Sequence, residues 1–316
     1  MSLHDYAGML LGSPRVAAFR EAIEGAVKPG MRVLDLGTGL GTYAMFAARA
    51  GAARVVAVDS DPVVHLARAI ALRNGLADRI EFVHARAPEG IPDEAFDLVI
   101  FEDYPTTFLD EGTWRLLEAV AAGHLAPGGA LLPSGVRFAL APVTRPPGPS
   151  APAAMGEEHS FLGLDWSELR THLANTGRKV HLPVGALGGE TRPGPRRPIL
   201  PLPRGEELGA EGEWTAGGDP VVALAFWFDL DLGGGRWVSN APGERGEPWG
   251  QWLLPVDPPL EAAAGSPQSA RVWREVRTDG GPGWMGWACE AGGATRRGHE
   301  FAGLPLSMDD VRGRGG

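Results

Sequence analysis

A glycine-rich turn between an apolar strand and a helix constrains this chain more than any other feature. Residues 33–36 read Val-Leu-Asp-Leu, and glycines occupy alternate positions over 37–41 before a helical pattern begins. A second apolar run, 55–58, ends in Asp59. Glycines allow a tight turn and a close approach of ligand to backbone, and a terminal carboxylate can accept hydrogen bonds from ribose hydroxyls. The pattern predicts the first half of a nucleotide-type site.

Alternating strand and helix patterns predict a doubly wound, Rossmann-like α/β domain in the first part of the chain. Continuously apolar strands such as 55–58 are typical of parallel sheets that are covered on both faces. A helix opened by Ser13 and Pro14 precedes the first strand. We expect strands at 31–36, 54–58, 80–84, 96–101 and 129–132, and helices at 42–50, 62–73 and 111–124.

Composition changes near residue 140 and predicts two domains, 1–140 and 141–316. Nine of the ten tryptophans follow that point. Short segments rich in Val, Trp and Phe are separated there by Gly/Pro turns, which indicates a mainly antiparallel, barrel-like unit with one helical interruption at 166–174. The clearest of these strand patterns are 221–228, 249–255 and 271–276.

Charge and cysteine content narrow the classes of partner. The formal net charge of −10 argues against a nucleic-acid footprint and suits a cationic substrate. Cys289 is the single cysteine, which favours a reducing, cytoplasmic setting. The first residues lack the basic start of a signal peptide, and no apolar run approaches the ~20 residues that span a bilayer. We therefore expect no nucleic-acid or membrane partner.

Proteins that bind NAD, FAD or S-adenosylmethionine all have a glycine-rich turn of this kind. The spacing of the glycines within the turn helps to distinguish the three cofactors. Glycines at alternate positions are closer than the dinucleotide Gly-x-Gly-x-x-Gly, which fits a ligand without a pyrophosphate. Asp35 would repel a phosphate but suits a cationic methionine group. Segments 96–101 and 124–133 also resemble the later strands of class I methyltransferases. The sequence favours S-adenosylmethionine, with these predicted contacts: Asp35, Gly37, Thr38, Gly39, Gly41 and Asp59.

Two longer segments resemble the protein arginine methyltransferases. Residues 35–52 are similar to that family's cofactor loop and helix, and residues 9–19 resemble its Met-Leu-x-Asp-x-x-Arg-x-x-x-Tyr, with Phe19 in place of the tyrosine. The resemblance implies S-adenosylmethionine as methyl donor, S-adenosylhomocysteine as product and no metal. It also implies these contacts: Arg15 with the cofactor carboxylate, Asp59 with the ribose, and Ala87 and Glu89 with the adenine.

Two glutamates are the predicted catalytic residues. Glu102 ends the predicted fourth strand, at the edge where open α/β sheets bind ligands, and Glu111 follows nine residues later. The arginine methyltransferases grip a guanidinium with two glutamates at this separation. A guanidinium is planar with five donors, and carboxylates can bind it in bidentate fashion. Holding charge on two of its nitrogens leaves the third more electron-rich for attack on a methyl group. The alternative for Glu111 is an acidic residue that favours a helix N-terminus.

The resemblance also implies substrate contacts, with departures from the family pattern. Met9 is kept at a position that bears on the number of methyl groups added, and Trp249 is kept from a Thr-His-Trp loop. Pro248 replaces the histidine of that loop. The double-glutamate loop reads Glu-Asp-Tyr-Pro instead of Glu-Trp-Met-Gly, so Tyr104 joins the predicted substrate contacts. Trp249 equally suits a barrel core. Segment 161–166 resembles the start of a dimerisation arm, which implies a homodimer.

Three functional hypotheses follow. The first is a methyltransferase that acts on a guanidino group of a protein, a peptide or an arginine-like metabolite. The second is a natural-product O- or N-methyltransferase on the same scaffold, in which both glutamates serve another acceptor. The third is a weakly active, cofactor-binding partner subunit. The position of Glu102 and Glu111 relative to one pocket separates the first from the second, and turnover separates the third.

Overall fold

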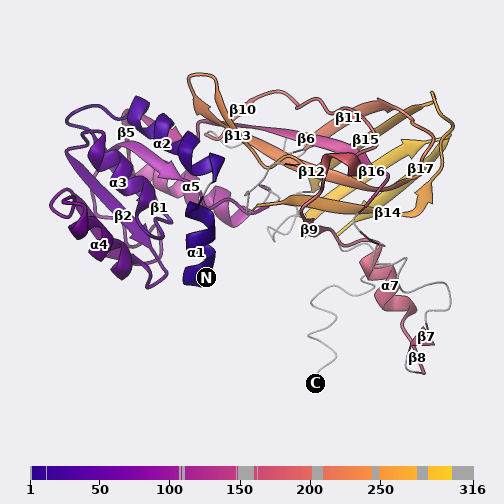
Figure 1. The fold of residues 1–316 in the computed structure, drawn as a ribbon, viewed down its shortest axis with the longest axis horizontal. Helices are drawn as coiled ribbons and strands as arrows, with labels where there is room; N and C mark the ends of the chain where they lie inside the picture. Colours follow the sequence, from indigo (N-terminus) through magenta and orange to yellow (C-terminus); the bar gives the residue numbers. More distant parts are fainter. Residues whose placement is uncertain are drawn as a thin grey trace.

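The computed structural model describes residues 2–11, 13–106, 108, 111–146, 148, 160, 161, 163–200, 209–243, 249–275 and 284–300. Figure 1 shows a helix-flanked parallel sheet at one end and two antiparallel sheets at the other. The parallel sheet has the order β3-β2-β1-β4-β5, as expected for a doubly wound domain. Its strands are β1 (Arg32–Leu36), β2 (Arg54–Asp59), β3 (Ile80–His84), β4 (Phe96–Phe101) and β5 (Leu125–Leu132).

Helices cover the parallel sheet and precede it. The central strands β1, β2 and β4 are buried along nearly their whole length, which explains their continuously apolar sequences. The small side chains Ala44, Ala47 and Ala48 of α3 let that helix lie close to the sheet. The helices are α1 (Leu3–Leu10), α2 (Pro14–Ala26), α3 (Thr42–Arg49), α4 (Val64–Arg73) and α5 (Glu111–His124).

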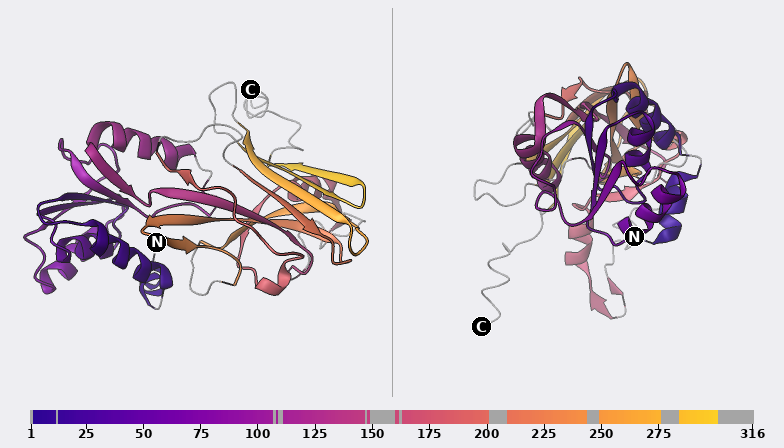
Figure 2. Two further views of the ribbon diagram at one scale, coloured as in Figure 1. Left: turned by 90° about the horizontal axis from the view of Figure 1, so that it is seen from above. Right: turned by 90° about the vertical axis from the view of Figure 1, so that its left-hand side faces the viewer.

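The antiparallel region consists of a six-stranded and a four-stranded sheet, with β11 and β15 against β6 and β17 against β14. Figure 2 shows the two sheets extending away from the α/β end. No hydrogen-bonded pairing joins them within the described residues, so the closed barrel stays a prediction. The first sheet contains β6 (Gly135–Val143), β9 (Arg178–Val180), β10 (Arg197–Pro198), β12 (Val221–Gly233), β13 (Arg236–Ser239) and β14 (Gln251–Leu260). The second contains β11 (Ala210–Thr215), β15 (Pro267–Glu275), β16 (Trp284–Ala291) and β17 (Ala294–His299).

Aromatic packing joins the two regions next to the end of β4. The ring of Phe108 lies 5.8 Å from that of Phe138 on β6 and 5.0 Å from that of Phe228 on β12, measured between centroids. Phe228 in turn lies 5.3 Å from Trp249. One hydrophobic core therefore continues from the α/β region into the β-sheets. Strand β6 spans residue 140, so the division into domains 1–140 and 141–316 stays a prediction.

A short arm projects from the body of the molecule (Figure 1). It contains β7 (Ser160–Phe161), β8 (Leu164–Asp165) and α7 (Ser167–Leu173), and the single-turn η1 (Val184–Ala186) follows later in the chain. The predicted helix at 166–174 is observed as α7. Among the helices in the described ranges, none combines the length and the apolar character needed to cross a bilayer.

Candidate functional site

The ends of three neighbouring strands define the candidate site. Strand β1 lies between β2 and β4, and its last residue, Leu36, pairs in register with Phe101 of β4. This is the point where the strand order reverses, and open parallel sheets bind ligands there, beyond the carboxyl ends of the strands. Gly37, Asp59 and Glu102 stand at or just past these ends. The predicted cofactor turn and the predicted catalytic glutamate therefore meet at one edge.

The glycine turn has the backbone geometry that its sequence predicts. Gly37, Gly39 and Gly41 all have positive φ, at 68°, 52° and 75°. A Cβ at Gly39 would lie 2.9 Å from the ring of Tyr6, and one at Gly41 would lie 2.8 Å from the ring of Phe82. Larger residues are therefore excluded both by conformation and by space. The turn is packed so closely against Tyr6 and Phe82 that glycine is required at both positions.

Asp35 holds this turn from beneath. The Thr38 hydroxyl and the Ala44 amide donate to its Oδ2 at 2.5 and 3.0 Å. The residue is only 1% exposed, and burial raises the pKa of its carboxyl to about 7. Asp35 does not line the cavities described below. Its position supports a role in shaping the loop, and its predicted contact with the cofactor stays a prediction.

Asp59 is fixed by backbone donors. Its Oδ2 accepts from the Gly39 amide at 2.7 Å, and its Oδ1 accepts from the Asp61 amide at 2.7 Å. The first bond ties the end of β2 to the glycine turn. Each carboxylate oxygen has further acceptor capacity, which suits the two hydroxyls of a ribose.

Arg15 and Glu102 form a largely buried ion pair. Arg15 Nη1 donates to Glu102 Oε1, with the side chains 3% and 20% exposed. The Arg15 guanidinium also lies 4.6 Å from the centroid of the Trp249 ring, as a cation–π contact. Arg15 is therefore not a solvated charge at the start of α2. Trp249 is 6% exposed and contacts both Arg15 and the Phe228 ring, so it belongs to the core and to the wall behind the site.

Two adjoining cavities follow the carboxyl edge of the sheet, and we call them together the cofactor groove. The first measures about 290 Å³ and the second about 580 Å³. Both are lined by Gly37, Asp59, Ser60 and Asp103, so they meet there. The first also contains Tyr6, Met9, Arg15, Thr38, Gly39 and Glu102. The second also contains Ala85, Arg86, Ala87, Pro88 and Thr113.

Helix α1 forms part of the wall of the first cavity. Ser2 and Asp5 form a capping box at the N-terminus of this helix: the Asp5 amide donates to the Ser2 hydroxyl, and the Ser2 hydroxyl donates to the Asp5 carboxylate. These bonds stabilise the first turn of a short helix. Tyr6 lies over Gly39, and burial raises its pKa to about 12, with the negative charge of Asp59 adding to the effect. Tyr6 was not among the predicted site residues, because no local motif marks its contact with a turn 33 residues away.

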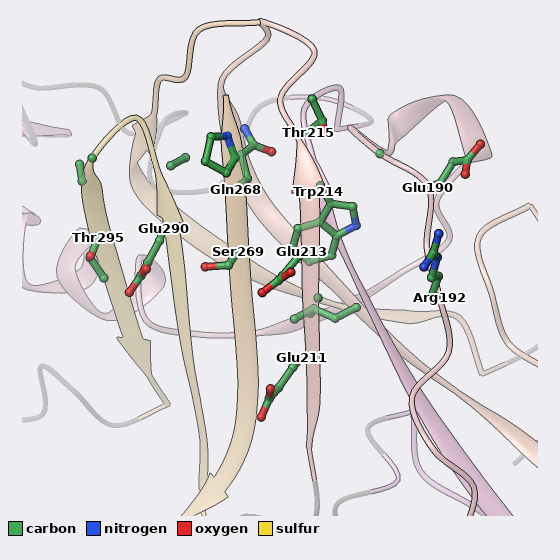
Figure 3. Close-up of a pocket in the computed structure, with 17 residues that line it drawn as sticks. Glu190, Arg192, Glu211, Glu213, Trp214, Thr215, Gln268, Ser269, Glu290 and Thr295 are labelled. Atoms are coloured by element: carbon green, nitrogen blue, oxygen red, sulfur yellow. The ribbon is translucent and has the colours of Figure 1, made fainter. Parts of the chain in front are cut away.

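A larger cavity, about 1160 Å³, lies on the β-sheets (Figure 3). Its acidic residues include Glu211 and Glu213 of β11 and Glu290 of β16, and Glu190 and Arg192 lie beside them. We call it the sheet-face cavity. Glu213, Ser269, Glu290 and Thr295 are paired across the strands and form one row, whereas Trp214 and Gln268 belong to the opposite, buried side. It contains none of the predicted site residues.

Comparisons with known proteins agree with this geometry. The family profile described as methyltransferase domain matches residues 33–129. An arginine N(omega)-methyltransferase of Streptomyces achromogenes subsp. streptozoticus is 31% identical over 290 residues, covering 84% of this chain and 74% of the relative. The chain belongs to the arginine N-methyltransferase family. It is an S-adenosylmethionine-dependent methyltransferase of class I.

Further relatives of the arginine N-methyltransferase family support the assignment. A probable protein arginine N-methyltransferase 6 of Arabidopsis thaliana is 33% identical over 247 residues, which cover 73% of this chain and 56% of the relative. The PRMT1 enzyme–prozyme complex of Trypanosoma brucei superposes with a TM-score of 0.76 at 21% identity, covering 90% and 94% of the two chains. Arabidopsis thaliana protein arginine methyltransferase 10 gives 0.72 at 20% identity, covering 95% and 98%. These structures show that the fold is shared over almost the whole chain.

The residues present fit S-adenosylmethionine. The first cavity runs along the glycine turn and leaves room for a ligand there, the buried Arg15 offers a cation for a carboxylate, and Asp59 offers fixed acceptors for a diol. The second cavity, which includes Ala87, has room for a base beyond Asp59. Within the described residues no three His, Cys, Asp or Glu side chains are grouped as metal ligands.

The structure brings most, but not all, of the predicted site residues together. Tyr104 lies in the core, 3% exposed, with its ring 4.5 Å from that of Phe108, and it does not line the groove. Glu89 is exposed and outside the lining of the second cavity. Glu111 begins α5, but its side chain lies outside the described residues, as does Pro248. Asp61 and Asp103 line the groove and were not predicted as ligand contacts.

Proposed function

We propose that this enzyme transfers a methyl group from S-adenosylmethionine to a guanidino nitrogen of an arginine-type acceptor, which is held by Glu102 and Glu111. The observation that carries the proposal is the position of Glu102. It lines the same cavity as Thr38, Gly39 and Asp59, so an acceptor bound to it lies beside the predicted cofactor contacts. The Streptomyces relative is named for methylation of an arginine ω-nitrogen, and the Arabidopsis relative for protein arginine.

The surroundings of Glu102 suit a planar cation. Glu102 pairs with the guanidinium of Arg15, and Trp249 covers a face of that same guanidinium. Arg15 fixes one carboxylate oxygen in place, which reduces the entropy lost when an acceptor binds. A second guanidinium can then be oriented by charge-assisted hydrogen bonds, which are stronger than hydrogen bonds between uncharged groups. The buried ion pair thus acts as a rigid support for the acceptor site.

The reaction is a displacement at carbon. When bound, S-adenosylmethionine supplies a methyl group activated by its sulfonium. The acceptor nitrogen, oriented by Glu102 and Glu111, would bond to that methyl carbon while the carbon–sulfur bonding pair would leave with sulfur. The nitrogen then loses a proton to a glutamate carboxylate or to water. The protein's part is to align the nitrogen, to concentrate positive charge on the other two guanidino nitrogens and to accept the proton.

The cofactor contacts form the second part of the proposal. We infer that Arg15 binds the cofactor carboxylate, that Asp59 binds the ribose hydroxyls, and that the turn of Gly37, Thr38, Gly39 and Gly41 supports the amino-acid group. Ala87 and Glu89 complete the inferred set at the adenine, and Met9, which lines the first cavity, is inferred to contact the acceptor. The lining of the cofactor groove supports the set, except for Gly41 and Glu89, which line neither cavity.

A radiolabelled methyl-transfer screen tests the proposal. The acceptors are free arginine, arginine peptides and matched peptides that contain citrulline, the neutral isostere of arginine. Labelling of an arginine acceptor but not of its citrulline counterpart is expected. Labelling of hydroxyl or amine acceptors alone would support the natural-product alternative. Cofactor binding without labelling of any guanidino compound would support the partner-subunit alternative.

Assembly and location are further proposals. We infer a homodimer formed through the arm, because Leu164 and Leu169 on β8 and α7 are 58% and 43% exposed on a projecting element. The Trypanosoma brucei relative is described as a heterotetrameric complex. Light scattering on the purified protein distinguishes a dimer from a monomer. A cytoplasmic location stays a prediction from the sequence.

A further inference from the structure

The junction of the two cavities in the cofactor groove contains two aspartates, Asp59 and Asp103. Among the residues that the structure describes, four line both cavities, namely Gly37, Asp59, Ser60 and Asp103. A ligand that occupies both cavities must pass these residues. In S-adenosylmethionine, the part that links the amino-acid group to the adenine contains the sulfonium and the ribose. The junction therefore faces the only part of the ligand whose charge changes during the reaction.

Asp103 and Asp59 differ in how their carboxylates are held. Backbone amides donate to both oxygens of Asp59. Asp103, in contrast, takes part in no hydrogen bond or ion pair within the described part of the chain. It stands across Gly37, where a Cβ would lie 3.3 Å from Asp103 Cβ and 3.8 Å from its Oδ2. Asp103 is thus an uncommitted carboxylate placed directly over the turn.

Electrostatics at the junction favour a cation. Part of the Asp103 side chain is open to solvent, yet loss of water around its carboxyl raises its pKa, and the negative charge of Asp59 adds to the effect. Arg15, which lines the first cavity, is already paired with Glu102, and Arg86 and Arg115 line only the second cavity. A ligand cation at the junction would reduce the repulsion between Asp59 and Asp103. The sequence also departs from the resembled loop here, because aspartate replaces a tryptophan.

We propose that Asp103 is a specificity-determining residue that makes this site prefer the cationic methyl donor over its neutral product. S-adenosylmethionine carries a sulfonium, whereas the thioether of S-adenosylhomocysteine is uncharged. A carboxylate beside the linking group attracts the first and has little attraction for the second. The positive charge leaves the sulfur during methyl transfer, so Asp103 assists binding of the donor and exchange of the product. It does not stabilise the transition state more than the bound donor.

Equilibrium binding measures this preference without turnover. Isothermal titration calorimetry compares S-adenosylmethionine, S-adenosylhomocysteine and sinefungin, an analogue with a cationic amine on carbon in place of the methyl sulfonium. For Asp103→Asn we expect the Kd of both cationic ligands to rise about fivefold to tenfold, while the Kd of S-adenosylhomocysteine changes less than about twofold. Asp103→Glu keeps the charge and should retain most of the preference.

Asp61→Asn is the matched control, because Asp61 lines only the first cavity and its loss removes the same charge away from the junction. Equal weakening of all three ligands by Asp103→Asn would overturn the proposal and leave Asp103 a purely structural role. If Asp61→Asn and Asp103→Asn reduced the preference for cationic ligands equally, the proposal would be overturned too, because the preference would then come from the negative potential of the whole groove. The inference rests on the proposed cofactor contacts but not on the acceptor. Failure of the wild-type protein to bind any of the three ligands would refute those contacts themselves.

Discussion

The cofactor groove and the sheet-face cavity are both acidic, but they hold their carboxylates differently. In the cofactor groove Asp59 accepts two backbone amides and Glu102 is paired with a buried arginine. In the sheet-face cavity Glu213 and Glu290 project from antiparallel strands and take no hydrogen bond or ion pair among the described residues (Figure 3). The sheet-face cavity is nevertheless larger than either cavity of the cofactor groove.

We propose from this difference that orientation, and not volume, marks the chemical site. A side chain that is held by amides or by a buried partner has lost its rotamer freedom before a ligand arrives, so less entropy is lost on binding. A carboxylate on an exposed strand remains hydrated and mobile, and an attraction to it is screened by salt. The comparison predicts that equal changes of charge will have very unequal effects in the two cavities.

Replacing Glu102 should have the largest effect. Glu102→Gln keeps the shape of the side chain but removes the charge from the acceptor site, so kcat should fall by about 100-fold or more. The Kd for S-adenosylmethionine should change less than about threefold. Steady-state kinetics and calorimetry on the same preparation measure the two values. Full activity of this variant would remove Glu102 from the mechanism.

Asp59→Ala should have the next largest effect and the opposite signature. It removes two acceptors from the predicted ribose site and the bond to the Gly39 amide, so the Kd for the cofactor should rise by roughly 10-fold to 100-fold. At saturating cofactor, kcat should recover to within about fivefold of the wild type. A loss of kcat that saturating cofactor does not restore would show that Asp59 serves the acceptor instead.

Asp35 should affect stability and its pH dependence. Its pKa is raised to about 7 in the folded protein from 3.8, because burial disfavours the ionised form. Its contribution to stability is therefore fully present below pH ~4 and is lost as the pH rises through 7. Asp35→Asn can still accept the Thr38 and Ala44 bonds through one oxygen and carries no such titration. Denaturant unfolding between pH 4 and 8 should give a flatter profile for the variant, and identical slopes would contradict the assignment.

The double variant Glu213→Gln, Glu290→Gln should have the smallest effect. It removes two charges from the sheet-face cavity but touches no residue of the cofactor groove. We expect kcat and the cofactor Kd to stay within about twofold of the wild type, measured alongside Glu102→Gln. A large rise in KM for an arginine peptide, but not for free arginine, would break the comparison and make the sheet face part of acceptor binding.

The sequence predicted the groove best where local patterns determine structure. Strands at 80–84 and 96–101 and the positive-φ glycine turn are observed as expected, because apolar runs and glycine spacing act over a few residues. The contact of Tyr6 with Gly39 and the pairing of Arg15 with Glu102 depend on packing between distant segments. Tyr104 was predicted at the substrate, but the neighbouring Phe101 and Phe108 rings draw it into the core.

In the β-region, the sequence predicted where strands lie but not how they pair. Strand patterns at 221–228 and 249–255 located β12 and β14, although both strands extend further, to Gly233 and Leu260. Which strands pair is decided by side chains that meet across the sheet, and this information is not local. The row formed by Glu213, Ser269 and Glu290 comes from three separate strands and appears only once the register is known.

The position of the transferred methyl group tests the central claim most directly. The enzyme is incubated with S-adenosylmethionine carrying a labelled methyl group and an equal mixture of an arginine peptide and its citrulline counterpart, or of the free amino acids. Tandem mass spectrometry then locates the label. We predict a label on a guanidino nitrogen of the arginine compound and none on the citrulline compound. Equal labelling of both, or labelling of any other atom, would contradict a guanidinium site at Glu102.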